Sequence, residues 1–260
     1  MPEPFVSVTA DGTIGWITLN RPPANSYDSE FVRQLGAAVE MVRNDDALRV
    51  VIVRSASEKF FSAGADVKAF AENSYDANMQ MILAEHAALE QMENTPKIFI
   101  AMIAGHCLGG GLEIALACDL RFAGDGNYKL GLPEVTLGLL PGNGGTQRLP
   151  RLIGKNKALD LMITGRTVSP SEALVLGIVD RVLPTNELEA QTKAYAESLA
   201  SGATFAVGSI KRAVNQGLQL PLHEGLMKER EITAKLFESE DAREGIAAFA
   251  EKRKPVYKGK

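Results

Sequence analysis

The sequence predicts an α/β fold in which short buried strands alternate with amphipathic helices, followed by a helical C-terminal region. Two apolar runs, residues 50–53 and 98–104, have the length of buried strands, and each leads into a glycine-containing turn and a helix-like pattern. From Asn186 onward the pattern is helical. We therefore expect an α/β core at residues 1–185 and a helical region at residues 186–260.

The composition is that of an ordinary globular protein. The 260 residues are 45% hydrophobic and 23% charged, with a formal net charge of −4, which argues against a nucleic-acid partner. No run approaches the ~20 apolar residues of a membrane span, and the N-terminus has no targeting pattern. Cys107 and Cys118 are expected to be free buried thiols in a reducing compartment. These features predict a cytoplasmic protein with no membrane partner.

The N-terminal segment is expected to form a hairpin, a turn and a helix. Residues 5–9 and 13–19 alternate apolar and polar side chains around Asp11-Gly12, a dipeptide that favours a tight hairpin turn. A rigid turn at residues 20–25 precedes a helical pattern that ends at Asp45-Asp46. The apolar face of this helix comprises Phe31, Leu35, Ala38, Val39 and Val42.

A second helix is predicted at residues 75–92, after a loop at residues 55–61 and a helix-like segment at residues 62–68. Its expected buried face comprises Met79, Ile82, Leu83, His86 and Leu89. We interpret His86 as a packing residue, because nothing nearby in the sequence would orient it for catalysis.

The central stretch is residues 97–120, KIFIAMIAGHCLGGGLEIALACDL. Its apolar run predicts a strand, its glycines predict a turn, and residues 112–118 predict a helix. A helix that starts at Gly110 points free N–H groups into the space above the strand, where they can hold a negative charge. Glu113 lies in the first turn, and this stretch alone leaves open whether it serves chemistry or only complements the helix dipole.

Further strands are expected at residues 119–124 and 178–183, with Glu134 in a loop or a first helical turn between them. The segment at residues 141–148, PGNGGTQR, is glycine-rich and is expected to line a site. The sequence contains no Walker A motif, nucleophile elbow, dinucleotide fingerprint or zinc-type ligand spacing. We therefore expect no metal and no redox cofactor.

Two backbone turns and two carboxylates remain as candidates for chemistry. Ala65 and Gly110 each begin a helix after a buried strand, so their N–H groups could converge on one oxygen as an oxyanion hole. Glu113 and Glu134 could flank an atom that gains or loses a proton. Spacing alone does not establish that these groups meet.

Four segments together resemble the enoyl-CoA hydratase/isomerase (crotonase) superfamily, namely residues 62–68, 104–119, 132–149 and 249–253. The resemblance extends from about residue 18 to the C-terminus. It implies a spiral of ββα repeats whose C-terminal helices form a trimer or a hexamer of two trimers. It also implies an acyl-CoA thioester substrate and no cofactor beyond the coenzyme A that the substrate carries.

The resemblance also implies roles for individual residues. Ala65 and Gly110 match the N–H donors that hold the thioester oxygen, and Glu113 and Glu134 match the carboxylates that hold the attacking water in hydratases. Arg21 is a weaker match near the CoA phosphates. The other substrate or CoA positions, the last two on a C-terminal helix that often belongs to a neighbouring subunit, are Ala63, Asp66, Val67, Lys68, Gly142, Phe249 and Lys252.

The predicted reaction is hydration of a 2-enoyl-CoA to a 3-hydroxyacyl-CoA, because hydratases keep both glutamates. The alternatives are a Δ3,Δ2-enoyl-CoA isomerase, another crotonase-type lyase or hydrolase, and, more distantly, a non-catalytic CoA- or RNA-binding scaffold. The sequence departs from the family at Ser26-Tyr27-Asp28, where small and aliphatic residues are usual, and at residues 119–129, which are one residue longer than expected. These departures leave the acyl chain undefined.

Overall fold

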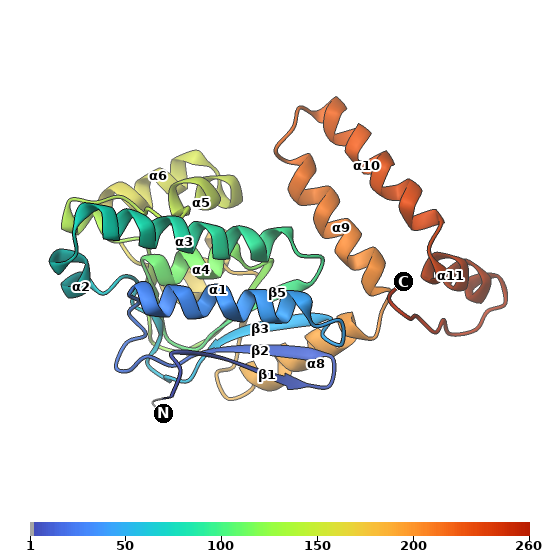
Figure 1. The fold of residues 1–260 in the computed structure, drawn as a ribbon, viewed down its shortest axis with the longest axis horizontal. Coiled ribbons are helices and arrows are strands. Elements are labelled where there is room, and N and C mark those ends of the chain that lie inside the picture. The colour runs from blue at the N-terminus through green and yellow to red at the C-terminus, as the bar shows by residue number, and fades with distance from the viewer. Residues whose placement is uncertain (1–2) are drawn as a thin grey trace.

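A six-stranded sheet forms the centre of the computed structural model, which describes residues 3–260 (Figure 1). Its strands, in spatial order, are β1 (Val6–Asp11), β2 (Ile14–Leu19), β3 (Val50–Ser55), β5 (Ile98–Ile103), β7 (Leu120–Gly124) and β9 (Arg181–Leu183). The β1 and β2 strands pair antiparallel, which confirms the predicted hairpin, and the other neighbours pair parallel.

A second sheet has three short parallel strands, β4 (Phe60–Ser62), β6 (His106–Leu108) and β8 (Leu130–Gly131). The chain repeatedly places one strand in the large sheet and the next in the small sheet, as β3 then β4, β5 then β6, and β7 then β8. Helices follow the first two of these strand pairs directly. This arrangement confirms the predicted spiral of ββα repeats.

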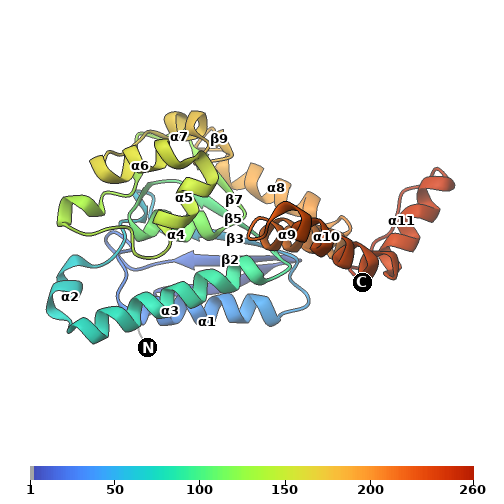
Figure 2. The same cartoon turned by 90° about the horizontal axis from the view of Figure 1, so that it is seen from above.

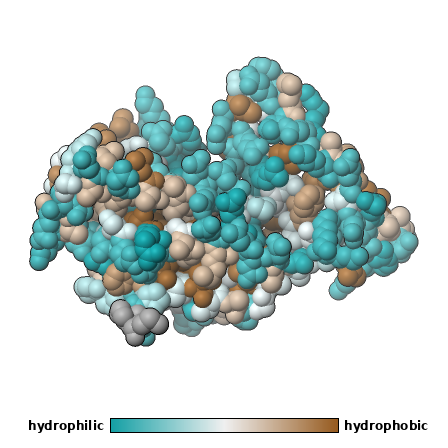
Figure 3. Space-filling view, viewed as in Figure 1, coloured by the Kyte–Doolittle hydropathy of each residue, from teal (hydrophilic) through white to brown (hydrophobic). Residues whose placement is uncertain are grey.

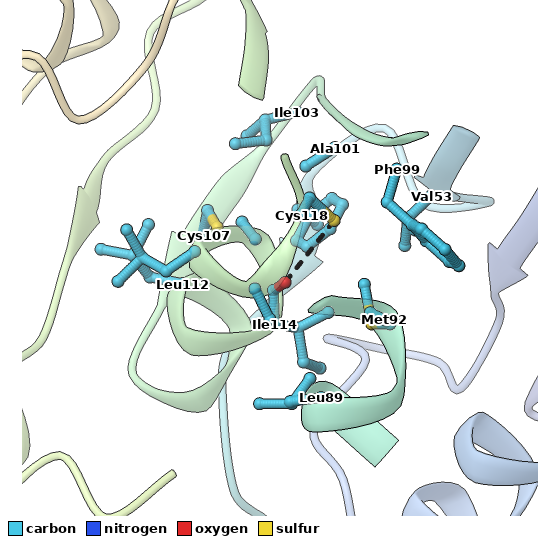
Figure 4. Packing of buried hydrophobic residues seen from close by; sticks show 14 of the residues in the cluster. Val53, Leu89, Met92, Phe99, Ala101, Ile103, Cys107, Leu112, Ile114 and Cys118 are labelled. Carbon is cyan, nitrogen blue, oxygen red and sulfur yellow. Dashed lines mark hydrogen bonds between the residues drawn. The ribbon is translucent and has the colours of Figure 1, made fainter. Parts of the chain in front are cut away.

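Both faces of the large sheet are buried at its central strands β3 and β5, which explains why these two strands are largely apolar. Val51 and Val53 of β3 pack in a cluster with α1 (Ser29–Asn44) and α3 (Tyr75–Asn94). Val50 and Ile52 point to the other face and pack with α8 (Leu188–Ala200). Figure 4 shows part of the first cluster, where Leu89 and Met92 of α3 lie beside Ile114 of the short helix after β6.

The α1 helix forms as the sequence predicts. Asp28 caps its N-terminus by accepting a hydrogen bond from the Phe31 N–H at 2.9 Å. All the predicted apolar positions of this helix are buried. Figures 1 and 2 show α1 and α3 lying side by side along the sheet.

The predicted extent of α3 is confirmed, but its predicted buried face is correct only at Leu89. The residues that it buries are Met81, Glu85, Ala88, Leu89 and Met92. Leu83 and His86 are exposed, so His86 is not a packing residue in this chain. The physical reason is that α3 buries an acidic side chain, Glu85. A pattern based on apolar residues assigns a glutamate to the exposed face, so it does not predict this orientation of the helix.

The remaining helices connect the strands and extend the C-terminal region. They are α2 (Val67–Glu72), α4 (Gly110–Ala117), the 3-10 helix η1 (Glu134–Leu137), α5 (Gly145–Ile153), α6 (Lys155–Thr164), α7 (Pro170–Leu176), α9 (Thr204–Gly217), α10 (Leu222–Phe237) and α11 (Glu240–Ala250). Ser169 accepts a hydrogen bond from the Glu172 N–H at 3.2 Å, as expected for the predicted cap of α7.

The C-terminal helices α9, α10 and α11 project away from the sheet (Figures 1 and 2), whereas α8 packs against β3, β5 and β7. The buried Lys211 ammonium fastens α9 to the core. It donates hydrogen bonds to the Met92 and Lys97 carbonyl oxygens and pairs with the Asp119 carboxylate at 2.8 Å. The expected boundary near residue 185 stays a prediction.

Candidate active site

The glycine turns before α2 and α4 lie in contact, and this contact brings two backbone N–H groups together. Gly64 has φ +87°, and a Cβ atom built on it would lie 3.1 Å from the Gly110 nitrogen and 3.0 Å from the Leu108 oxygen. Only glycine allows this approach, because a side chain at Gly64 would meet backbone atoms. Ala65 directly follows Gly64, so the turns that carry the Ala65 and Gly110 N–H groups are neighbours, and the convergence of these groups on one oxygen stays a prediction.

Both N–H groups are free to bind an oxygen. Neither the Ala65 nor the Gly110 N–H donates to another backbone or side-chain group within residues 3–260. Gly110 is the first residue of α4, where the N–H groups of a helix have no partner inside the helix. The positive end of the helix dipole adds to the attraction for a negative oxygen.

A buried loop fixes the position of Ala65. The Asn25 side chain, 1% exposed, donates hydrogen bonds to the Ser55 hydroxyl at 2.7 Å and to the Phe61 carbonyl at 3.0 Å. The Ser62 hydroxyl donates to the Asn25 carbonyl at 2.7 Å and accepts from the Gly64 N–H at 3.1 Å. These bonds hold the turn before Ala65 without using the Ala65 N–H itself.

Glu113 lies in the first turn of α4 and is almost wholly buried. Its Oε1 atom accepts hydrogen bonds from the Asn143 and Gly145 N–H groups, both at 2.7 Å. Burial raises the pKa of Glu113, while the two N–H groups and the charge of Arg148 act in the opposite direction. The predicted glycine-rich loop therefore does line a site, and the backbone of that loop orients one carboxylate.

Glu134, the first residue of η1, faces the same glycine turn. A Cβ atom on Gly109 would lie 3.0 Å from Glu134 Oε1. The Oε2 atom of Glu134 is buried and has no hydrogen-bond partner among the described residues. Burial, reinforced by the charge of Glu113, raises the pKa of Glu134 to about 7. Such a carboxyl can give up or take a proton near neutral pH.

Several residues of the site could not be identified from the sequence. The Asn143 side chain donates a hydrogen bond to the Tyr27 hydroxyl at 2.7 Å, and Tyr27 is 2% exposed. Arg148 donates to the Asn143 carbonyl at 2.9 Å and pairs in a bidentate manner with Glu93. The only sequence signal was Tyr27 itself, which stands where an aliphatic residue is usual.

The expected Gly142 position lies beside Glu113, because the next residue donates its N–H to that carboxylate. The Gly142 carbonyl oxygen lies 2.7 Å from His86 Nε2. His86 thus contacts the glycine-rich loop at residues 141–148 from the exposed side of α3, a contact that its position in the sequence does not reveal.

The predicted CoA positions divide into two groups. Ala63, Asp66, Val67 and Lys68 lie in or next to the turn that carries Ala65. Asp66 caps α2 and pairs with Arg21 at 3.1 Å, and Arg21 also pairs with Asp28 at 2.9 Å. Arg21 is therefore engaged within this chain.

Phe249 and Lys252 belong to the second group, at the end of α11 and just after it. Phe249 is 88% exposed. Figure 1 shows α2 and α11 at opposite sides of the molecule, so a single chain does not bring Phe249 and Lys252 to the turns of Ala65 and Gly110. Their predicted contact with CoA in a neighbouring subunit stays a prediction.

No helix within residues 3–260 combines the length and the apolar character needed to cross a membrane.

The fold and this site define a class of protein. Neighbouring turns whose N–H groups have no partner in the described part of the chain, and two buried carboxyls near them on a spiral of ββα repeats, are features suited to reactions in which a carbonyl oxygen gains negative charge while a proton moves nearby. Residues 9–260 match the family model for enoyl-CoA hydratase/isomerase. The chain belongs to this family, and its fold is crotonase-like, as the sequence predicts.

Individual relatives agree with this assignment. A probable enoyl-CoA hydratase of Mycobacterium bovis is 41% identical over 254 residues, which cover 97% of each chain. A short-chain-enoyl-CoA hydratase of Clostridium acetobutylicum is 36% identical over 250 residues, 96% of this chain and 95% of the relative. A crystal structure of an enoyl-CoA hydratase from Geobacillus kaustophilus superposes with a TM-score of 0.97 at 46% identity, covering 100% of this chain and 98% of the other.

Proposed function

We propose that this protein adds water across the C2=C3 bond of 2-enoyl-CoA thioesters to give 3-hydroxyacyl-CoA. The observation that supports the proposal is that the Ala65 and Gly110 N–H groups, in two neighbouring glycine turns, have no hydrogen-bond partner within residues 3–260, while two buried carboxyls with different surroundings lie near these turns. Glu113 is held by two N–H donors, and burial raises the pKa of Glu134 to about 7. The names of the most similar relatives support the same reaction.

In the proposed reaction the thioester oxygen accepts hydrogen bonds from the Ala65 and Gly110 N–H groups. This polarisation makes C3 electrophilic. A water oxygen forms a bond to C3 as Glu113 takes a proton from the water, and the π electrons of C2=C3 move into an enolate. The held oxygen carries the enolate charge until Glu134 gives its proton to C2. Proton exchange between the two glutamates and solvent then restores the starting state.

The two glutamates suit these separate tasks. Burial raises the pKa of Glu113, but its two N–H donors act against burial and favour the ionised form that a base requires. Glu134 has an unpaired buried oxygen and a pKa of about 7, so below neutral pH it holds the proton that an acid must donate. Neighbouring carboxyls whose surroundings differ in this way divide the roles of acid and base.

We also propose that the C-terminal helices mediate a homotrimer or a hexamer of two trimers. Large apolar side chains are exposed along α9, α10 and α11, and brown apolar residues appear on this projecting part of the surface in Figure 3. The most exposed are Leu218, Leu222, Phe237, Ile246 and Phe249. Exposed apolar residues in this density are typical of an interface. Sedimentation or light scattering would give the assembly mass.

The test of the proposed reaction is a direct assay with crotonyl-CoA. Loss of the conjugated enoyl-thioester absorbance, with a product that carries its hydroxyl at C3, supports hydration. A parallel assay with a 3-enoyl-CoA separates the alternatives, because an isomerase would convert that substrate to the conjugated thioester and leave crotonyl-CoA unchanged. Release of free CoA would instead indicate a hydrolase.

A further inference from the structure

A third carboxyl, Glu85, lies inside the protein near Glu113, one of the two glutamates of the proposed reaction. It belongs to the buried face of α3, and its exposed fraction is 0%. Both carboxyl oxygens lack a hydrogen bond of normal geometry within residues 3–260. A buried polar group without a partner is costly, so its presence requires a reason other than packing.

The groups around Glu85 connect it to the site. Burial raises the pKa of Glu85 most and the charge of Glu113 raises it further, whereas the neighbouring Tyr27 hydroxyl and the charge of Arg148 lower it. The same hydroxyl accepts a hydrogen bond from Asn143 at 2.7 Å. Because that bond uses the Tyr27 oxygen as acceptor, the hydroxyl hydrogen is available for Glu85.

Tyr27 also touches the glycine turn that carries the Gly110 N–H. A Cβ atom on Gly110 would lie 2.5 Å from two atoms of the Tyr27 ring. The Tyr27 backbone is bridged to Ala65 in parallel register, and its N–H donates to the Gly64 oxygen at 3.0 Å. Tyr27 therefore contacts both turns that supply the N–H groups, as well as the loop that holds Glu113.

The charge on Glu85 follows from its surroundings. Two carboxyls in one buried region cannot both be ionised at low cost. Glu113 has two backbone N–H donors and Glu85 has none, so the negative charge resides on Glu113. In agreement, burial and the charge of Glu113 raise the pKa of Glu85 well above its ordinary value.

We propose that Glu85 is a protonated positioning residue, which orients the Tyr27 hydroxyl and, through Asn143, holds the loop whose N–H groups bind Glu113. The inference rests on the proposed hydration, since its effect is on Glu113 as the base. Glu85 does not touch substrate in this role. It acts on the reaction by keeping the Asn143 N–H at 2.7 Å from Glu113.

The first test compares Glu85→Met with Glu85→Gln. Methionine fills the space but cannot meet the Tyr27 hydroxyl, whereas glutamine is a neutral isostere of a protonated glutamate. We expect Glu85→Met to lower kcat about ten-fold or more, which corresponds to weakening one hydrogen bond to a charged group. We expect KM to change little, and we expect Glu85→Gln to keep kcat close to that of the wild type.

The pH profile provides a readout that a packing role would not change. The N–H groups on Glu113 lower its pKa, so a loosened loop raises that pKa. Glu113 must be ionised to act as a base, so the acid limb of kcat/KM should move to higher pH in Glu85→Met. Tyr27→Phe should move it in the same direction, and this variant tests the same link if Glu85→Met does not fold. Glu90→Met, on the exposed side of the same helix, is the matched control.

Infrared difference spectroscopy of the free enzyme tests the protonation of Glu85 without any substrate. At neutral pH, the difference between the spectra of the wild type and Glu85→Gln should show the carbonyl band of a protonated carboxyl. Absence of that band would overturn the inference even if the proposed hydration failed. An unchanged kcat and pH profile in Glu85→Met would also overturn it, as would a Glu85→Gln variant impaired as severely as Glu85→Met.

Discussion

Replacement of Gly110 by alanine probes the oxyanion site with a single methyl group. The added Cβ would overlap the hydroxyl and ring of Tyr27, which is 2% exposed and hydrogen-bonded to Asn143. The ring cannot withdraw at low cost, because its surroundings are packed. The backbone of the turn must therefore move, and the Gly110 N–H moves with it.

The expected effect is large because the N–H is one of two donors for the developing oxyanion. Loss of one such donor costs roughly 10²–10³-fold in kcat, or about 2.7–4 kcal/mol of transition-state stabilisation. The assay is the initial rate of crotonyl-CoA hydration over a range of substrate concentrations. The drop should appear mainly in kcat, because the N–H groups bind the charged transition state more strongly than the substrate.

A second glycine provides the control. Gly36 lies within α1, and a Cβ atom there would be 3.9 Å from the Ala88 side chain, an ordinary contact. Gly36→Ala should keep full activity and should stabilise the helix by up to about 1 kcal/mol. A folded Gly110→Ala variant with wild-type kcat would refute the assignment of the Gly110 N–H as an oxyanion donor.

Three further variants and one pH profile test other parts of the mechanism and the fold. Glu113→Gln and Glu134→Gln should each lower kcat by about 10²–10⁴-fold, as expected for loss of a general base or acid, and wild-type kcat in either would contradict the two-carboxyl mechanism. Because the pKa of Glu134 is raised to about 7, its acid form is present below that pH and is lost above it, so kcat/KM should fall on the alkaline side; a profile flat across neutrality would contradict this role. Lys211→Met leaves Asp119 and two carbonyl oxygens without their buried partner, which should destabilise the fold by about 3–5 kcal/mol in denaturant titrations.

The sequence predicts those parts of the fold where the pattern and the packing agree. The run at residues 98–104 is apolar because β5 is covered on both faces, and the glycines after it occur where the backbone must approach Gly64. The Ala65 and Gly110 turns could be identified for the same reason. Their mutual contact could not, since it depends on how two repeats of the spiral stack.

The supporting residues of the site cannot be predicted in this way, because they are polar residues that are buried in the fold. Glu85 lies on a helix face that hydropathy would assign to solvent, and the buried face of α3 shares only Leu89 with the predicted face. Asn143 contributes its backbone N–H as well as its side chain, and no residue pattern marks a backbone donor. Tyr27 is visible in the sequence as a departure from its family, but only the fold shows which groups it contacts.

Hydration in water labelled with ¹⁸O tests the central claim most directly. Crotonyl-CoA incubated with the enzyme in this solvent should give 3-hydroxybutyryl-CoA with ¹⁸O in the C3 hydroxyl and no label in the thioester carbonyl, as measured by mass spectrometry. With Glu113→Gln or Glu134→Gln as the enzyme, almost no ¹⁸O should enter the C3 position. Label that appears only in a released free acid, or an unlabelled thioester recovered from active wild-type enzyme, would contradict the account.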